Sequence, residues 1–158
     1  MATPVAAVDE VKVRAAREDE AEVLIGMYEW LFAPPGYAPR SWDPGNAQTA
    51  LVEAIAAENS TVLVAESPLG DLVGVISAYL DLNSVRYGLR CWVEDLAVDP
   101  SRRSAGVGKA LLDEAKQWAR ERGATHLELD TGLARHDAQR FYEREEPTTK
   151  GYSYSWAL

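Results

Sequence analysis

The residues best placed to do chemistry are a basic, glycine-rich turn from Arg102 to Gly108 and an acidic pair, Glu94 and Asp95, shortly before it. The turn contains two arginines and two glycines and leads into a helical pattern of apolar residues. The first N–H groups of a helix have no intrahelical acceptor, and the helix dipole places about +0.5 charge there. Glycine lets such a backbone approach an anion without a Cβ in the way. The turn therefore predicts a phosphate-binding cradle.

Two common phosphate-binding motifs do not fit this turn. A P-loop needs Gly-x4-Gly-Lys-Ser/Thr, but Ala110 follows Gly108-Lys109, and Arg103 stands in place of the first glycine. A dinucleotide fingerprint needs a third glycine three residues after the second, where this chain has Leu111. The pattern that remains is Arg103-Ser-Ala-Gly-Val-Gly108, of the form Arg/Gln-x-x-Gly-x-Gly/Ala.

With this motif the chain resembles the GNAT superfamily of acetyl-CoA-dependent N-acetyltransferases, in which the loop binds the pyrophosphate of coenzyme A. A second segment, residues 130–142, contains Ala138-x-x-Phe141-Tyr142 and is similar to the late helix of that family. The resemblance covers residues 11–158. It implies the GNAT fold, of the α/β (α+β) class. In that fold a mixed, mostly antiparallel sheet is splayed around the cofactor and flanked by about four helices.

The resemblance also implies which residues hold the cofactor, acetyl-CoA. In the family, the sheet opens between the strand that ends near Val98 and the strand that contains Leu127. The pantetheine arm then pairs with the backbone of the first of these strands. The expected cofactor-binding residues are Leu96, Ala97 and Val98 on the strand and Arg103, Ser104, Ala105, Gly106, Val107, Gly108 and Lys109 in the loop.

The two carboxylates could neutralise an acceptor amine. An amine of pKa about 10.4 is almost fully protonated at pH 7, which adds about 4.6 kcal/mol to the barrier at about 1.36 kcal/mol per pKa unit. A general base recovers much of this. The resemblance places the base at Glu94. Asp95 is the rival base and a candidate substrate-binding residue, because strand neighbours point to opposite faces and a bulge here would reverse which one faces the cleft.

The departing thiolate also needs a proton, since a free thiol has a pKa near 8.5. The resemblance implies that Tyr142 donates it and that Phe141 is a core residue. The chain departs from the family pattern at two places nearby. Arg135 stands at the helix start, where the family often has a cofactor-contacting asparagine, and Glu146-Pro147 replaces a frequent Gly-Phe in the wall of the acceptor site.

A proline-rich loop, residues 32–42, carries the candidate acceptor-binding aromatics Tyr37 and Trp42. Loops on a rigid scaffold often carry binding residues, and aromatic rings bind cations. The net charge of −9 disfavours a nucleic-acid partner and is compatible with a cationic amine. We expect a small-molecule amine substrate and neither a nucleic-acid nor a membrane partner. Whether the protein forms a homodimer is left open.

Composition sets wider bounds. A chain of 158 residues that is 47% apolar fits one domain, residues 11–158, after a disordered tail at residues 1–10. The tail lacks the basic and apolar regions of a secretory signal. The single cysteine, Cys91, excludes an internal disulfide and fits a cytoplasmic protein. Two histidines and one cysteine without ligand spacing argue against a metal site.

Residue patterns predict the elements that must position these side chains. Alternating and apolar runs predict strands at residues 11–15, 61–66, 72–82, 89–98, 126–130 and 152–158. Three of these form an antiparallel meander before the glycine turn, and the strand at 126–130 should lie parallel to the one ending at Val98. Helices are predicted to begin at Arg17, Asp43-Pro44, Gly106 and Arg135. The first should bury a stripe that includes Val23 and Leu24.

The leading hypothesis is an enzyme that moves the acetyl group of acetyl-CoA directly to a primary amine of a small cationic molecule, such as a polyamine or an aminoglycoside. One alternative is acetylation of a protein lysine or N-terminus. An alternative from another class is a non-catalytic sensor domain that binds acyl-CoA, against which the presence of both Glu94 and Tyr142 weighs.

Overall fold

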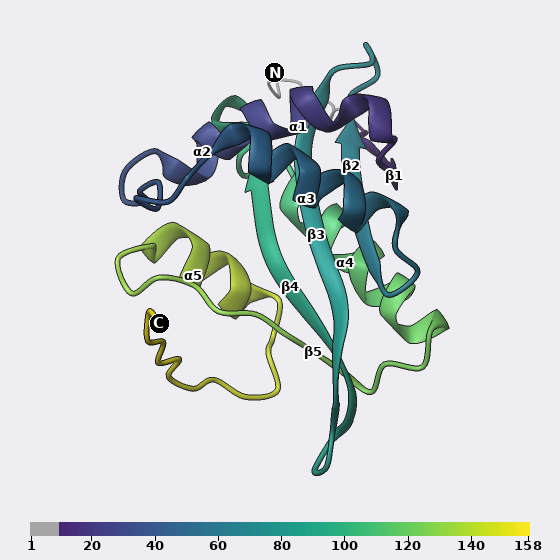
Figure 1. The fold of residues 1–158 in the computed structure, drawn as a ribbon, viewed down its shortest axis with the longest axis vertical. Helices are drawn as coiled ribbons and strands as arrows, with labels where there is room; N and C mark the ends of the chain where they lie inside the picture. The colour runs from purple at the N-terminus through teal and green to yellow at the C-terminus, as the bar shows by residue number, and fades with distance from the viewer. Residues whose placement is uncertain (1–9) are drawn as a thin grey trace, which may run out of the picture.

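The computed structural model describes residues 10–158, so the predicted tail at residues 1–10, apart from Glu10, lies outside the described residues. A five-stranded sheet in the order β1-β2-β3-β4-β5 carries helices on both faces (Figure 1). The strands are β1 (Lys12–Ala15), β2 (Ser60–Glu66), β3 (Leu72–Ser84), β4 (Gly88–Val98) and β5 (His126–Glu128). The α-helices are α1 (Ala21–Gly26), α2 (Tyr28–Phe32), α3 (Pro44–Ala56), α4 (Val107–Glu121) and α5 (His136–Arg144). Two short 3-10 helices are η1 (Glu18–Glu20) and η2 (Pro100–Arg102).

The pairing of the strands confirms the predicted topology. Strands β1 to β4 pair antiparallel in chain order, and β5 lies parallel to β4. The parallel pairing joins Arg90–Trp92 to His126–Glu128 and extends no further along the described strands. The second half of β4, residues 93–98, therefore has β3 on one side and no described strand on the other. The sheet is splayed at this point, as expected.

Helix α4 covers one face of the sheet, and its apolar side packs on the central strands (Figure 1). Its buried residues include Leu111, Leu112 and Ala115, which share a core with Ile76 and Cys91. The helix begins where the sequence predicts, because Gly106 occupies the N-cap in the left-handed region, with φ 85°. The glycine-rich turn predicted to bind a phosphate is thus anchored by a well-packed helix.

Helices α1, α2 and α3 cover the opposite face. The single helix predicted from Arg17 is instead split into η1, α1 and α2, with Met27 between α1 and α2. Helix α1 buries Ala21 and Leu24, which are three residues apart, and this leaves Val23 59% exposed on the outer side, so the prediction for Val23 is wrong. The start of α3 is confirmed: the Asp43 carboxylate accepts a hydrogen bond from the Asn46 N–H at 2.7 Å, with proline following the cap.

The predicted strand at residues 152–158 is wrong. These residues form no strand, and Tyr152, Tyr154 and Trp156 are 75–83% exposed. The segment curls beside α5 (Figure 1). Alternating large and small residues form a strand when a neighbouring strand and a buried face receive them, and no described strand lies beside this segment.

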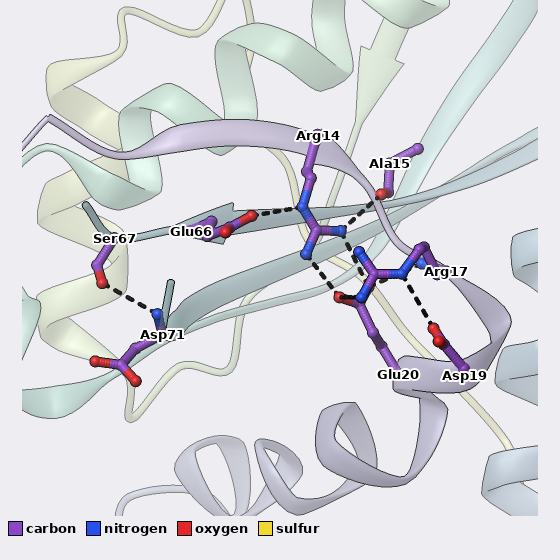
Figure 2. Close-up of polar contacts among 8 residues, drawn as sticks. All are labelled: Arg14, Ala15, Arg17, Asp19, Glu20, Glu66, Ser67 and Asp71. Carbon is purple, nitrogen blue, oxygen red and sulfur yellow. Dashed lines mark hydrogen bonds and ion pairs between the residues drawn. The ribbon is translucent and has the colours of Figure 1, made fainter. Parts of the chain in front are cut away.

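An ion-pair cluster around Arg14 fastens the beginning of the chain to the sheet (Figure 2). Arg14 on β1 binds Glu66 on β2 at 2.6 Å and Glu20 in η1 at 2.6 Å. The Glu20 carboxylate also accepts a hydrogen bond from the Arg17 backbone N–H at 2.9 Å. The cluster joins η1, which directly precedes α1, to strands β1 and β2 at this edge of the sheet. No described helix combines the length and the apolarity that crossing a membrane requires.

Candidate active site

A β-bulge on β4 determines where the two candidate carboxylates point. Asp95 lies opposite Ser77 on β3, whereas Val93 lies opposite the next residue, Ala78. Glu94 is therefore an extra residue in β4, and strict alternation of side chains is broken there. Both carboxylates raise the pKa of Tyr79, which places them near the same side chain on the face covered by α1 to α3.

The two carboxylates have different surroundings. Glu94 is exposed, and its Oε2 accepts a hydrogen bond from the Trp92 indole N–H at 2.7 Å. Asp95 is half-buried, and its Oδ2 accepts a hydrogen bond from the Tyr28 hydroxyl at 2.7 Å. Burial raises the pKa of Asp95, the hydrogen bond from Tyr28 opposes this, and the charge of Glu94 adds to it.

Asp95 lines a pocket of about 200 Å³ between the helices and the sheet. The other lining residues are Ile25, Tyr28, Trp42, Ala47, Ala50, Leu51, Ser77 and Tyr79. Burial is the main cause that raises the pKa values of Tyr28 and Tyr79, followed by the nearby Asp95 charge. Both phenols thus stay protonated and can donate hydrogen bonds.

Of the two loop aromatics predicted to bind the acceptor, the structure brings only Trp42 to this pocket. Its ring stacks on Tyr28 with centroids 5.6 Å apart and meets Phe32 edge-on at 4.7 Å. Tyr37 is 81% exposed and is not a lining residue.

The candidate proton donor Tyr142 packs, with Phe141, against the core that α4 shares with the sheet. Its neighbour Phe141 packs so close to Gly108 that a Cβ at Gly108 would lie 3.4 Å from the ring. Glycine at this position therefore allows α5 to approach the cofactor loop. Burial raises the pKa of Tyr142 to about 12, although the Arg135 charge acts in the opposite direction.

The loop from β4 to α4 has the features that a pyrophosphate needs. Gly106 has φ 85°, and a Cβ there would meet nothing within 4 Å, so this side of the loop is open. Arg103 is exposed beside it. The Lys109 ammonium forms ion pairs with Asp113 at 3.0 Å and Glu145 at 3.2 Å. The group of Lys109 that can bind a phosphate is therefore its backbone N–H. Together with the uncovered edge of β4, these residues fit coenzyme A.

Arg135 joins two parts of the chain that are far apart in sequence. Its guanidinium donates a hydrogen bond to the Leu31 carbonyl at the end of α2, at 2.8 Å. A Cβ at Gly36 would lie 2.5 Å from that guanidinium and would collide with the same carbonyl, so only glycine fits. Arg135, which departs from the family pattern, thus ties the end of α2 and the loop at Gly36 to the beginning of α5.

Sequence reasoning missed Tyr28, Ser77 and Tyr79. Tyr28 lies outside the apolar stripe predicted for its helix, and Tyr79 is one aromatic among many in strands. The sequence holds one signal for Ser77: it is a polar residue in an apolar run, after Val75-Ile76 and before Ala78.

Comparison with known proteins gives a family match over most of the chain. The profile of the acetyltransferase (GNAT) family matches residues 23–145. The uncharacterized N-acetyltransferase YhdJ of Bacillus subtilis is 46% identical over 37% of this chain and 42% of its own length. The aminoalkylphosphonate N-acetyltransferase of Salmonella typhimurium is 34% identical over 56% of this chain and 58% of its own length. The chain thus spans about half the length of these curated relatives.

A solved structure shares the fold. The aminoglycoside N-acetyltransferase AAC(6')-Iy, in complex with CoA, superposes with a TM-score of 0.78 at 18% identity, over 94% of this chain and 95% of the other. At this identity the likeness concerns the fold alone.

Proposed function

The chain belongs to the acetyltransferase (GNAT) family, and on that premise we propose that it transfers the acetyl group of acetyl-CoA to a primary amine of a small cationic molecule. The observation that carries the proposal is the bulge in β4, which breaks the alternation of side chains at Glu94, beside the Asp95 that lines an aromatic pocket. A relative named for acetylation of an aminoalkylphosphonate supports an amine acceptor.

In this proposal the loop and β4 hold the coenzyme. The N–H groups of residues 104–109 and the Arg103 guanidinium bind the pyrophosphate, and the backbone of Leu96, Ala97 and Val98 pairs with the pantetheine arm. When bound, acetyl-CoA supplies the activated acetyl group.

Glu94 accepts the proton that the attacking amine loses, directly or through a water molecule. Its carboxylate is exposed and its orientation is fixed by the indole of Trp92. The amine nitrogen forms a bond to the acetyl carbon, and the bond between that carbon and sulfur breaks. Tyr142 donates its phenolic proton to the departing thiolate, so the products are an amide and a free thiol.

The proposal predicts a pH-dependent loss in Glu94→Gln. At neutral pH, kcat/KM for an amine should fall by about 10²–10⁴, the usual contribution of a positioned base. The loss should shrink as the pH approaches the amine pKa, because the substrate then arrives neutral. Thiol release from acetyl-CoA across a panel of primary amines measures this, and exposed Glu114→Gln on α4 is the matched control.

Two outcomes would contradict this assignment. A loss in Glu94→Gln that is uniform across pH would make Glu94 a positioning residue. A pH-dependent loss in Asp95→Asn alone would make Asp95 the base. Failure of the protein to bind acetyl-CoA in calorimetric titration would overturn the proposed function as a whole.

A further inference from the structure

We propose that Trp92 and Arg90 are positioning residues for the transfer: they hold the Glu94 carboxylate in the orientation in which it accepts a proton from the amine. The proposal rests on the proposed function, in which Glu94 is the base. It adds two residues that act through Glu94 and contact neither substrate. The contacts that carry it run along β4, from Asp81 on the neighbouring strand through Arg90 and Trp92 to Glu94.

Glu94 needs such a partner because its place in the strand does little to fix its side chain. The residue is exposed and is the extra residue of the β4 bulge. It lies within residues 93–98, the half of β4 that has no described strand on one side. A glutamate side chain has several rotatable bonds, and a reacting group displaced by about 1 Å can lose about 10²-fold in rate. A base in this position therefore depends on a contact that fixes its rotamer.

The indole of Trp92 makes that contact. Its N–H donates a hydrogen bond to Glu94 Oε2 at 2.7 Å, and within residues 10–158 the carboxylate has no other hydrogen bond or ion pair. The bond occupies Oε2 and leaves Oε1 to accept the proton of an amine or of a water molecule. Trp92 itself is half-buried and lies opposite Tyr79 on β3 and Glu128 on β5. The half of β4 that is paired on both sides thus holds the base in the half that is open.

Arg90 in turn fixes the indole. Its guanidinium carbon lies over the Trp92 ring, 5.2 Å from the ring centroid. The guanidinium donates two hydrogen bonds to Asp81 on β3, from Nε at 3.0 Å and from Nη2 at 2.9 Å. A third hydrogen bond, from Nη1 to Glu128 on β5, measures 3.3 Å. A guanidinium with a bidentate carboxylate partner has a defined plane, so the ring that stacks on it is held as well.

The geometry separates this role from direct contact with the acceptor. One face of the Trp92 ring is already covered by Arg90, a cation that repels a second cation. Trp92 is also not among the residues that line the pocket containing Asp95. The part of Trp92 that serves the reaction is therefore the indole N–H and not the ring.

The test is a double-mutant cycle on steady-state acetyl transfer from acetyl-CoA to a primary amine, 1,4-diaminobutane. Trp92→Phe keeps a ring beside Arg90 and removes the N–H. It should lower kcat by about 10-fold or more and leave both KM values nearly unchanged, because Trp92 touches neither substrate. In the Glu94→Gln background the same substitution should change kcat by less than about 2-fold, since no base is left to position. A coupling of about 10-fold corresponds to about 1.4 kcal/mol.

A second arginine–tryptophan pair provides matched controls. Arg122 lies over the Trp118 ring at 4.7 Å, at the end of α4, and within the described chain the Trp118 indole donates to no carboxylate. Trp118→Phe and Arg122→Met should leave kcat unchanged. Arg90→Met should lower kcat by less than Trp92→Phe does. Arg90→Lys, which keeps a cation for the ring and for Asp81, should retain most of the wild-type rate.

The indole N–H signal of Trp92 in a two-dimensional ¹H–¹⁵N NMR spectrum tests the contact without turnover. The signal is assigned as the one that Trp92→Phe removes. Glu94→Ala should shift its proton resonance upfield, because the hydrogen bond to the carboxylate is lost. Glu114→Ala, at an exposed position on α4, should leave the signal in place.

An unmoved indole signal in Glu94→Ala, or equal losses from Trp92→Phe with and without Glu94, would overturn the proposal. If Trp92→Phe does not fold, Arg90→Met takes its place in the same cycle, and a loss independent of Glu94 again counts against the positioning role. The proposed function fails separately. A protein that binds no acetyl-CoA in calorimetric titration refutes that function, whereas one that acetylates the diamine with Trp92 and Glu94 uncoupled refutes the positioning role alone.

Discussion

At the scale of single residues, two neighbouring carboxylates on the β4 bulge have different surroundings. Glu94 and Asp95 have nearly the same chemistry, but one is exposed beside an indole N–H and the other is half-buried against a phenol. Burial raises the pKa of Asp95. The sequence left both orientations open, because a bulge depends on cross-strand register and has no signature within β4 alone.

Tyr142→Phe should keep the ring and lose only the proton donor. Turnover should fall by about 10²–10⁴ while acetyl-CoA affinity stays nearly unchanged, since the two side chains fill similar volume. The loss should shrink for an acetyl thioester whose leaving thiol has a low pKa, because that thiolate needs no proton. Steady-state kinetics with both thioesters measure the difference.

The pH profile provides a check on this role. With the pKa of Tyr142 raised to about 12, the phenol stays protonated through neutral and moderately alkaline pH, so its ionisation should cause no fall in rate there. Full activity in Tyr142→Phe would mean that water protonates the thiolate and that the tyrosine only packs.

At the scale of elements, local periodicity predicted most strands and helices to within a few residues. The glycine-rich loop and the α3 cap follow from short-range chemistry that the chain shows directly, and the parallel β4–β5 pair follows from the strand–helix–strand order of residues 88–128. The wrong predictions concern segments whose structure depends on contacts with residues far away in the sequence. Helix formation from Arg17 was interrupted at Met27, and the segment at residues 152–158 had no partner strand among the described residues. The pocket, which needs side chains from α1, α2, α3, β3 and β4 and from the turn before α3, could not be predicted from the sequence.

The Arg14 cluster predicts an acid-sensitive attachment of the first helices. Arg14 and the Arg17 N–H lower the pKa of Glu20 to about 2, below its ordinary value of 4.5. A depressed carboxylate pKa stabilises the fold above the ordinary pKa, and this stabilisation is lost as the pH falls toward about 2. Glu20→Gln should therefore lower the free energy of unfolding at pH 7 by about 2–3 kcal/mol, a difference that narrows in acid.

Urea denaturation at several pH values measures this effect. Asp19→Asn is the control, because the Asp19 side chain is 75% exposed in its pair with Arg17 and should change stability by less than about 1 kcal/mol. A Glu20→Gln deficit that stayed constant down to pH 2 would show that lost packing, and not charge, is responsible.

At the scale of the whole molecule, the net negative charge should attract a cationic acceptor and repel the polyanionic coenzyme. The net charge is −9, while the loop that is proposed to hold the polyanionic coenzyme carries Arg102, Arg103 and Lys109. Long-range attraction should raise the encounter rate of cationic amines, and salt should screen it.

Raising the salt concentration from about 0.02 M to about 0.5 M shortens the Debye length several-fold. This change should raise the KM for a diamine, 1,4-diaminobutane, more than it raises the KM for a monoamine, butylamine. The reason is that the diamine carries twice the charge. Steady-state kinetics at fixed, saturating acetyl-CoA measure both amines, with sucrose at equal osmolarity as the control. Equal salt responses of the two amines would exclude steering by the overall charge.

The hydrogen bond from Arg135 to the Leu31 carbonyl links positions 104 residues apart, and this has a consequence for the order of assembly. During synthesis the first four strands can pair before residue 135 leaves the ribosome, since each pairs with its neighbour in the chain. The hydrogen bond from Arg135 to the end of α2, beside Gly36, can form only when nearly the whole chain has emerged. A nascent or truncated chain can thus pair its first four strands before the end of α2 is tied to α5, so the proposed acceptor site is completed only after the sheet.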